Sequence, residues 1–328
     1  MNDIMVSICC MTYNQADYIK DAIESFLMQK TNFKFEIIIH DDASKDNTQK
    51  IIKEYEKKYP DIIKPIYQVE NQYSKGEKIE LLMFEKAQGK YIALCEGDDY
   101  WVYKEKLQKQ VEYMEEHPEC SLCFHDAKIF DEKTKKFFKY KYQNKRCKKK
   151  NGIYTAGELE LYGFIPTASY LFKKEHVSEM PEFFYRSIVG DKPLRLILAS
   201  YGYAFEINKI MSVYRKGTGI SVTDRFNLNN EMKKKAIKHY EDLIKIIDGF
   251  NEFSSWKFKD EMEISKKKLK ISILENEEKY SEILKNPEFR KILTKKIKLK
   301  YFIKLHFPKL FLKIKKLKNV LLKNYIVR

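Results

Sequence analysis

The residues best suited to chemistry in this sequence are the acidic run Glu96-Gly97-Asp98-Asp99. Three carboxylates within four residues repel one another unless a cation or hydrogen-bond donors neutralise them. A hard divalent ion such as Mg²⁺ or Mn²⁺ binds carboxylate oxygens and leaves positions open for water and phosphate oxygens. The run therefore favours a metal–diphosphate site over the alternative, a solvated acidic turn.

Two more polar segments follow apolar runs in the same way. Thr12-Tyr13-Asn14-Gln15 comes after the run Met5–Met11, and His40-Asp41-Asp42-Ala43-Ser44 comes after Phe35–Ile39. Acidic pairs after strands also act as caps and turn formers, and for Asp42 and Ser44 both interpretations are open. Neither G-x-G-x-x-G nor G-x-x-x-x-G-K-[ST] occurs, which excludes the usual glycine-rich phosphate loops.

The elements that must position these residues alternate along the first 130 residues. Short apolar runs predict strands, and apolar residues at helical spacing predict helices between them, with Ser44 expected to cap the second helix. The order β-α-β-α-β-α-β predicts a parallel, doubly wound sheet covered by helices. Ligands of such sheets bind outside the carboxyl ends of the strands, where the three polar segments stand.

Beyond residue 120 the pattern changes, and it predicts three parts in all. Residues 1–225 form the α/β domain, which divides into residues 1–130 and 131–225. Residues 226–294 form a helical extension, and residues 295–328 a basic tail. No run of about 18 uncharged apolar residues occurs, and the N-terminus lacks a basic-then-apolar leader, so we expect a cytoplasmic protein. The cysteines, including the pair Cys120 and Cys123, are expected to be reduced thiols without a metal.

The net charge of +16 is concentrated in two segments. Residues 295–328 hold 12 Lys or Arg and no acidic residue, and residues 133–150 hold ten and none. A nucleic-acid binder would carry a basic face through its folded body, so we expect no nucleic-acid partner. In the tail, Lys alternates with Ile, Leu and Phe on either side of Pro308, a pattern typical of helices at an anionic membrane surface. A partner-docking or solvated helix is the alternative, and the block 133–150 fits an acceptor-facing or an ordinary loop.

Taken together and in this order, the motifs resemble the family 2 glycosyltransferases with the GT-A fold. The resemblance rests on Val6-Ser7-Ile8 with Thr12-Tyr13-Asn14, on Asp41-Asp42-Ala43-Ser44, on Gly89 through Trp101 and Lys106 through Gln110, and on Gly190 through Leu194 and Val213-Tyr214-Arg215. It covers about residues 4–220 and implies a GT-A (Rossmann-like) doubly wound mixed sheet with a C-terminal helical extension. It also implies that residues 1–130 are the nucleotide-binding half and residues 131–225 the acceptor-binding half of the domain.

The resemblance also implies roles for individual residues. Asp98 and Asp99 correspond to the ligands of Mn²⁺ or Mg²⁺, and Asp191 corresponds to the catalytic base. The first acidic position of the run is Glu96 where the family usually has Asp. No His follows Tyr214-Arg215 to complete a metal shell, and two alternatives are open: the metal keeps a water there, or Arg215 and Lys216 contact the diphosphate directly. The residues expected to bind the nucleotide-sugar are Thr12, Tyr13, Asn14, Asp41, Gln72, Lys75, Glu96, Asp98 and Arg215. For Gln72 and Lys75 a solvated loop, and for Asp191 a plain helix cap, are the alternatives.

The function that this resemblance implies is an inverting transfer of a sugar from a nucleotide-sugar, most simply a UDP-sugar, to a hydroxyl of a glycan or lipid-linked acceptor. Such an enzyme would build bacterial surface polysaccharide or lipooligosaccharide at the inner face of the cell membrane. A sugar-phosphate nucleotidyltransferase shares a similar sheet but would need a glycine-rich phosphate loop. A non-catalytic membrane-binding module on the same fold is the third candidate.

Overall fold

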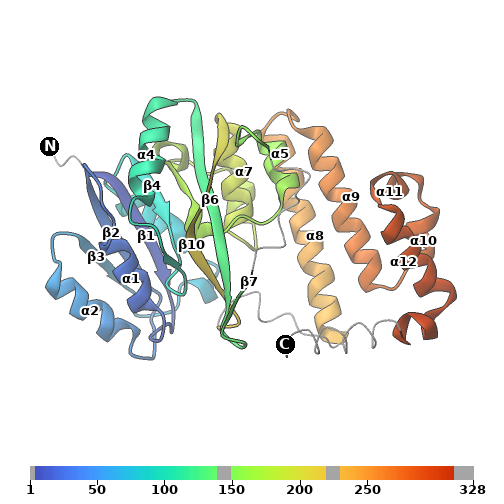
Figure 1. Ribbon diagram of the computed structural model, residues 1–328, viewed down its shortest axis with the longest axis horizontal. Helices are drawn as coiled ribbons and strands as arrows, with labels where there is room; N and C mark the ends of the chain where they lie inside the picture. Colours follow the sequence, from blue (N-terminus) through green and yellow to red (C-terminus); the bar gives the residue numbers. More distant parts are fainter. Residues whose placement is uncertain (1–3, 139–148, 219–229, 314–328) are drawn as a thin grey trace. The chain divides into compact units, whose positions relative to one another are not determined.

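The structure is a computed structural model that describes residues 4–138, 149–218 and 230–313 (Figure 1). The predicted tail beyond residue 313 and most of the basic block 133–150 lie outside the described residues. The described residues form two compact units, one within the ranges 1–227 and 248–261 and one within the ranges 228–247 and 262–328. The expected division at residue 225 stays a prediction.

The first unit is built on one mixed sheet whose neighbouring strands follow the order β3-β2-β1-β4-β9-β6-β10-β5, with β7 beside β6 and β8 beside β10. The strands are β1 (Ile4–Thr12), β2 (Lys34–Asp41), β3 (Ile63–Tyr67), β4 (Tyr91–Leu94), β5 (Tyr100–Trp101), β6 (Cys120–Asp131), β7 (Lys136–Phe138), β8 (Ile153–Tyr154), β9 (Leu171–Lys173) and β10 (Tyr203–Lys216). Strands β3, β2, β1 and β4 are parallel, as the sequence predicts, and β9 runs antiparallel to β4.

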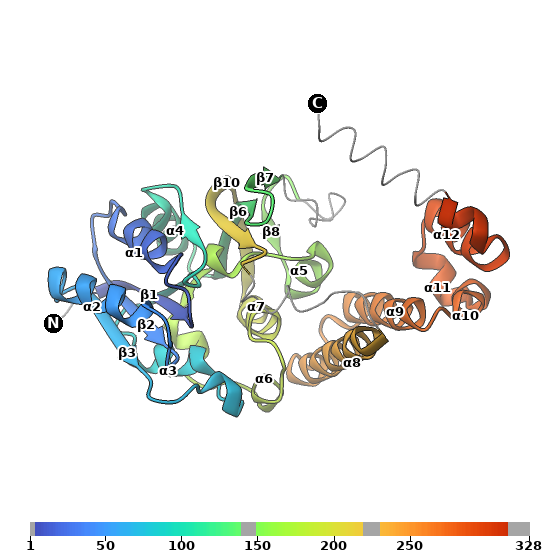
Figure 2. The ribbon, with the colours of Figure 1, turned by 90° about the horizontal axis from the view of Figure 1, so that it is seen from below.

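The helices of this unit are α1 (Ile19–Leu27), α2 (Thr48–Lys58), α3 (Ile79–Lys86), α4 (Lys106–Glu116), α5 (Ala156–Tyr162), α6 (Glu182–Tyr185) and α7 (Asp191–Ser200). Figure 2 shows α1 and α4 on one side of β1 and β2, and α3 on the other. Because both faces are covered, β1 is buried continuously over residues 6–10, which explains its unbroken apolar sequence.

The remaining helices are α8 (Asn230–Phe253), α9 (Lys259–Asn276), α10 (Tyr280–Lys285), α11 (Pro287–Ile292) and α12 (Lys295–His306). In the second unit, Ile271 of α9, Ile283 of α10 and Tyr301 of α12 form a small buried cluster. No helix in the described part of the chain is long and apolar enough to cross a bilayer.

Candidate functional site

The ends of three parallel strands bring the predicted polar segments to one edge of the sheet. Thr12 at the end of β1 pairs with Asp41 at the end of β2, and β4 lies on the other side of β1. The Gly97 N–H donates to the Met11 carbonyl at 2.8 Å, which ties the acidic run to β1. The three segments therefore share one site, although their residues lie up to 87 positions apart in the sequence.

Asp41 is fully buried and uses only one of its two carboxylate oxygens within the chain. Its Oδ2 accepts hydrogen bonds from the Ser44 N–H at 3.1 Å and from Gln49 Nε2 at 2.6 Å. Its Oδ1 is buried and has no hydrogen-bond partner among the described residues. A buried acceptor left open in this way suits a ligand N–H, such as the imide of a uracil base.

The turn after β1 is locked to the loop after β2. Asn14 has a left-handed backbone (φ 51°), its N–H donates to Ser44 Oγ at 2.8 Å, and its Oδ1 accepts from the Lys45 N–H at 2.7 Å. The expectation that Ser44 caps the following helix is wrong, because this contact engages its hydroxyl and α2 begins after Asn47. Tyr13 on the same turn is 37% exposed, which leaves its ring open for stacking on a base.

The acidic turn packs so closely against β1 that its second position must be glycine. A Cβ at Gly97 would lie 2.5 Å from Gln15 Oε1 and 2.9 Å from Thr12 Oγ1. That Thr12 hydroxyl is buried and, in the described part of the chain, has no hydrogen-bond partner. Because residue 97 has no side chain, the backbone of the acidic turn can lie close to the end of β1.

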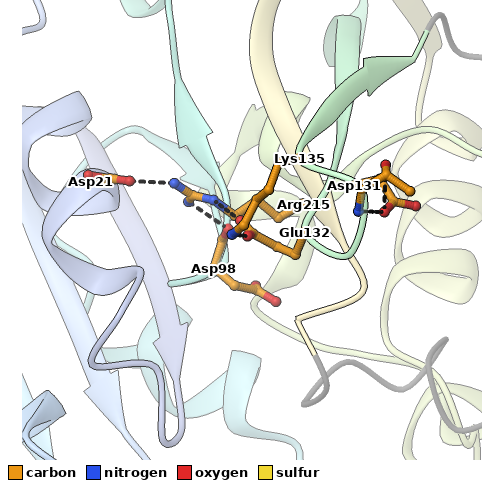
Figure 3. A network of polar contacts seen from close by, with 7 residues as sticks. Asp21, Asp98, Asp131, Glu132, Lys135 and Arg215 are labelled. Carbon is orange, nitrogen blue, oxygen red and sulfur yellow. Dashed lines mark hydrogen bonds and ion pairs between the residues drawn. The ribbon is translucent and has the colours of Figure 1, made fainter. Parts of the chain in front are cut away.

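Arg215 of β10 holds the acidic turn from the other side (Figure 3). Its backbone N–H donates to Asp99 Oδ1 at 2.8 Å, and its Nη1 donates to the Asp98 carbonyl oxygen at 2.9 Å. Its guanidinium also pairs with Asp21 and, at 3.2 Å, with Glu132. The Asp98 carboxylate points away from the guanidinium in Figure 3. Arg215 is thus occupied by the chain itself, and its diphosphate contact stays a prediction.

The three carboxyl groups of the run differ in what they can offer a ligand. Asp99 is 1% exposed and bound to the Arg215 amide, whereas Asp98 is partly exposed. Burial, followed by repulsion from Asp98 and Glu96, raises the pKa of Asp99 well above its usual value. Burial and repulsion from Asp98 raise the pKa of Glu96 to about 7. A divalent cation would relieve this repulsion, so the donor set fits Mn²⁺ or Mg²⁺.

The residues that the structure describes do not supply a complete metal shell on their own. Among the residues that the structure describes, no group of three His, Cys, Asp or Glu side chains is placed to hold a metal ion. A cation here would need other oxygens, and diphosphate and water are the ligands that Mg²⁺ and Mn²⁺ commonly keep. The assignment of Asp98 and Asp99 as metal ligands stays a prediction, with Asp98 the more accessible of the two.

Asp191 is the first residue of α7, and Gly190 precedes it as the N-cap. The alternative that Asp191 is the cap residue itself is therefore wrong. Asp191 lies near enough to the acidic turn that its charge contributes to the raised pKa of Glu96. One helical turn later, the buried Arg195 guanidinium lies 3.7 Å from Glu160.

The loop before α3 is held by Asp42, whose role as a turn former or a site residue the sequence leaves open. Asp42, 2% exposed, accepts hydrogen bonds from the N–H groups of Gln72 at 2.7 Å and Tyr73 at 3.1 Å. The side chains of Gln72 and Lys75 both contact Glu70, the first at its carbonyl oxygen and the second as an ion pair. Their predicted phosphate contacts are untested, whereas Asp42 has a clear structural role.

Other features lie away from this site. Cys120 and Cys123 are both buried in β6, and the five cysteines in the described part of the chain are free thiols. A hollow of about 660 Å³ opens where β1 and β4 begin, at the opposite edge of the sheet. Two of the lysines lining it, Lys90 and Lys173, bind Glu115 and the Pro118 carbonyl oxygen. This hollow is not part of the acidic site.

Comparison with protein families finds a match over about half of the chain. The model of glycosyl transferase family 2 matches residues 7–176, which include most of β1, the strands β2 to β9 and the acidic turn. Asp191 and Arg215 lie beyond the matched residues.

Two sequence relatives illustrate the range of similarity. An uncharacterized protein of Mycobacterium tuberculosis is 44% identical over 127 residues, 39% of this chain and 36% of the relative. The UDP-Glc:alpha-D-GlcNAc-diphosphoundecaprenol beta-1,3-glucosyltransferase WfaP of Escherichia coli is 38% identical over 112 residues, 34% of this chain and 41% of the relative. The match thus spans less than half the length of either relative.

Two solved structures resemble the fold at low sequence identity. TarS of S. aureus, residues 1–349 in complex with UDP-GlcNAc, has a TM-score of 0.56 at 16% identity and covers 92% of this chain and 79% of that one. The mannosyltransferase PcManGT from Pyrobaculum calidifontis, in complex with GDP-Man and Mn²⁺, has a TM-score of 0.54 at 13% identity, covering 93% and 82%. At these identities the likeness concerns the fold, and it agrees with the GT-A architecture expected from the sequence.

Proposed function

The chain belongs to glycosyl transferase family 2, and from this premise we propose that it is an inverting enzyme that uses a nucleotide-sugar donor, most simply a UDP-sugar. The sugar would pass to a hydroxyl of a glycan or lipid-linked acceptor, as a hexosyl or acetylhexosaminyl group. A role in glycosyl transfer follows from the family; the mechanism, the donor and the acceptor are the proposal.

The observation that carries this proposal is the convergence of Asp41 and the acidic turn at one edge of the sheet. The turn after β4 can hold a metal–diphosphate, and the charge of Asp191 acts on Glu96 of that turn. An inverting transfer needs a carboxylate that removes the acceptor proton on the side of the anomeric carbon opposite the leaving diphosphate. Two carboxylates at one site, one at a strand end and one at a helix start, provide both functions.

Each residue of the site has a defined task in the proposed reaction. Asp41 Oδ1 would accept from the base and Tyr13 would stack on it, which fixes the nucleoside. Asp98, with Asp99, would hold the metal that stabilises charge on the departing diphosphate. Asp191 would take the proton from the acceptor hydroxyl as the hydroxyl oxygen attacks the anomeric carbon. Arg215 keeps the acidic turn in place through its contacts with Asp98 and Asp99.

The related proteins support the donor and the metal in this proposal. TarS is in complex with UDP-GlcNAc and PcManGT with GDP-Man and Mn²⁺. WfaP is a glucosyltransferase that is named for UDP-Glc and a diphosphoundecaprenol acceptor. A lipid-linked acceptor would place this chain at a membrane surface in the synthesis of surface polysaccharide. That location, the inner face of the cell membrane, also fits the basic residues from 295 onward.

Calorimetric titration of UDP into the full chain, with and without Mn²⁺, tests the donor site. We expect micromolar binding that requires Mn²⁺ and that falls at least about tenfold in Asp98→Asn, because the variant removes a charged metal ligand. Asp61→Asn is the matched control, since Asp61 is exposed and precedes β3 at the other edge of the sheet. If UDP, GDP, dTDP and CMP all fail to bind with Mn²⁺ present, the nucleotide-sugar proposal is wrong.

A further inference from the structure

Two residues at the start of α3, Lys78 and Glu80, contact the segment that leads into Asp191. Lys78, just before α3, donates a hydrogen bond from Nζ to the Ser187 carbonyl oxygen, 109 positions later in the chain. The same Nζ lies 5.5 Å from the centre of the Phe184 ring, close enough for a cation–π contact. One lysine thus holds two points of the segment 184–190.

The Glu80 carboxylate lies against Gly190, at the end of the same segment. A Cβ at Gly190 would lie 2.1 Å from Glu80 Oε1 and 3.2 Å from its Cδ, so the carboxylate fills the space that a side chain would need. Gly190 is the N-cap of α7 and offers no side chain to the free N–H groups of the helix start. Burial raises the pKa of Glu80, and the charge of Asp191 adds to this, while Lys78 acts in the opposite direction.

The chain before Lys78 is fixed at the end of β2, where Asp41 and Asp42 lie. Asp42, next to Asp41, binds the N–H groups of Gln72 and Tyr73, and the chain then runs through Lys78 into α3. A single stretch, residues 72–80, therefore joins the end of β2 to the start of α7.

We propose that Lys78 and Glu80 are positioning residues that fix Asp191 for proton removal by holding the segment 184–190 against α3. This inference rests on the proposed function, because it takes Asp191 as the base. Neither residue needs to touch the substrate. A displacement of about 1 Å can reduce the rate of an enzymatic step by about a hundredfold, so a loosened segment would lower turnover without removing donor binding.

Amide hydrogen exchange of the full chain tests whether Lys78 and Glu80 hold the segment 184–190, and it does not depend on any activity. We expect residues 184–191 to exchange faster in Lys78→Met and in Glu80→Ala than in the wild type. Glu85→Ala is the matched control, because Glu85 is exposed on the same helix. Unchanged exchange of 184–191 in both variants would overturn the inference.

Release of nucleoside diphosphate from the nucleotide-sugar that the chain binds tests the consequence for catalysis. In Glu80→Ala we expect kcat to fall at least about tenfold with the donor KM changed by less than about threefold, and Glu80→Gln, which keeps the shape, to restore most of kcat. If Asp191→Asn abolishes turnover and Glu80→Ala keeps it, the inference is wrong and the proposed base stands. If Asp191→Asn keeps turnover, both are wrong.

Discussion

The backbone N–H of Arg215 donates a 2.8 Å hydrogen bond to Asp99 Oδ1 across 116 positions of sequence. The bond joins the last long strand of the sheet to the turn that carries the metal candidates. Since Asp99 is buried and its oxygen is engaged, Asp98 is left as the carboxylate of this pair that can face a ligand. The two adjacent aspartates therefore differ in what they can offer a ligand: one Asp99 oxygen is engaged by the Arg215 amide, and Asp98 is the more accessible of the two.

Replacement of Arg215 by lysine should destabilise the first unit and weaken nucleotide binding. Lysine cannot reach Asp21, Glu132 and the Asp98 carbonyl oxygen together, and the nearly buried Glu132 would lose a partner. We expect a loss of about 2–4 kcal/mol in the free energy of unfolding. Urea unfolding followed by fluorescence measures it, because both tryptophans, at positions 101 and 256, belong to the first unit.

The matched control for this substitution is Arg186→Lys. Arg186 pairs with Glu182 on the surface, and both side chains are about three-quarters exposed. Exposed ion pairs contribute roughly 0–1 kcal/mol, so this variant should unfold like the wild type. Equal stability of Arg215→Lys and Arg186→Lys would contradict the role assigned to Arg215.

Replacement of Asp41 by asparagine should abolish nucleoside recognition while leaving the fold intact. The remaining carbonyl oxygen can still accept from Ser44 and Gln49, but the atom at the place of Oδ1 becomes an NH₂ donor. The new side-chain NH₂ and the imide N–H of the base would then both be donors and could not bond to each other. We therefore expect UDP to bind at least about tenfold more weakly. Titration of UDP into Asp41→Asn and into the exposed control Asp17→Asn measures the difference. Equal affinities would remove Asp41 from the nucleoside site.

The sequence predicts the sheet and the strand ends well because both depend on local patterns. Continuous apolar runs identify β1, β2 and β4, and parallel order brings their carboxyl ends together. The wrong expectation for Ser44 has a simple cause: a Ser before a helix is typical of a cap, but here its hydroxyl serves Asn14 on another loop.

The contacts that hold the site together could not be predicted in the same way. Arg215 meets Asp21 and Glu132, and Glu80 meets Gly190, through tertiary folding across distant parts of the sequence. Nothing in the local sequence around Arg215 or Glu80 indicates its contact partner. The only local sign is Gly190 itself, a glycine where a helix start more often has Ser, Thr, Asp or Asn.

The buried Lys106 should make stability depend on pH near neutrality. Its Nζ donates to Gln110 Oε1 at 2.7 Å and lies 4.0 Å from the centre of the Trp101 ring, and burial lowers its pKa to about 7. Between about pH 7 and the normal value of 10.5 the unfolded chain holds a proton that the folded chain lacks. The free energy of unfolding should therefore rise with pH in this window, by at most about 1.4 kcal/mol per pH unit from this group.

The difference in urea stability between the wild type and Lys106→Met isolates this contribution. It should shift in favour of the wild type as the pH rises from 7 to about 8.5, below the range in which the buried cysteines add their own effect. Lys109→Met is the control, since Lys109 is exposed on the same helix. A wild-type minus Lys106→Met difference that stays constant with pH would show that Lys106 keeps its normal pKa.

The exposed face of α12 should direct binding to anionic membranes. Leu299 and Phe302 are 58% and 46% exposed, whereas Tyr301 between them is buried in the cluster of the second unit. Lysines flank this apolar face, and each basic residue near an anionic surface contributes about 1 kcal/mol. We expect the full chain to sediment with vesicles that contain phosphatidylglycerol and much less with pure phosphatidylcholine. The double variant Leu299→Ser with Phe302→Ser should bind at least about tenfold more weakly, because both side chains lose their apolar contact with the acyl region.

The matched control for the membrane test is Val69→Ser, because Val69 is an apolar residue of the first unit that is 89% exposed. It should bind the anionic vesicles as the wild type does. Since Leu299 and Phe302 point to solvent, their replacement spares the cluster around Tyr301, and circular dichroism should show the helices unchanged. Wild-type binding by the double variant would show that α12 is not the membrane-binding face. Equal binding to both kinds of vesicle would show that the lysines do not direct it.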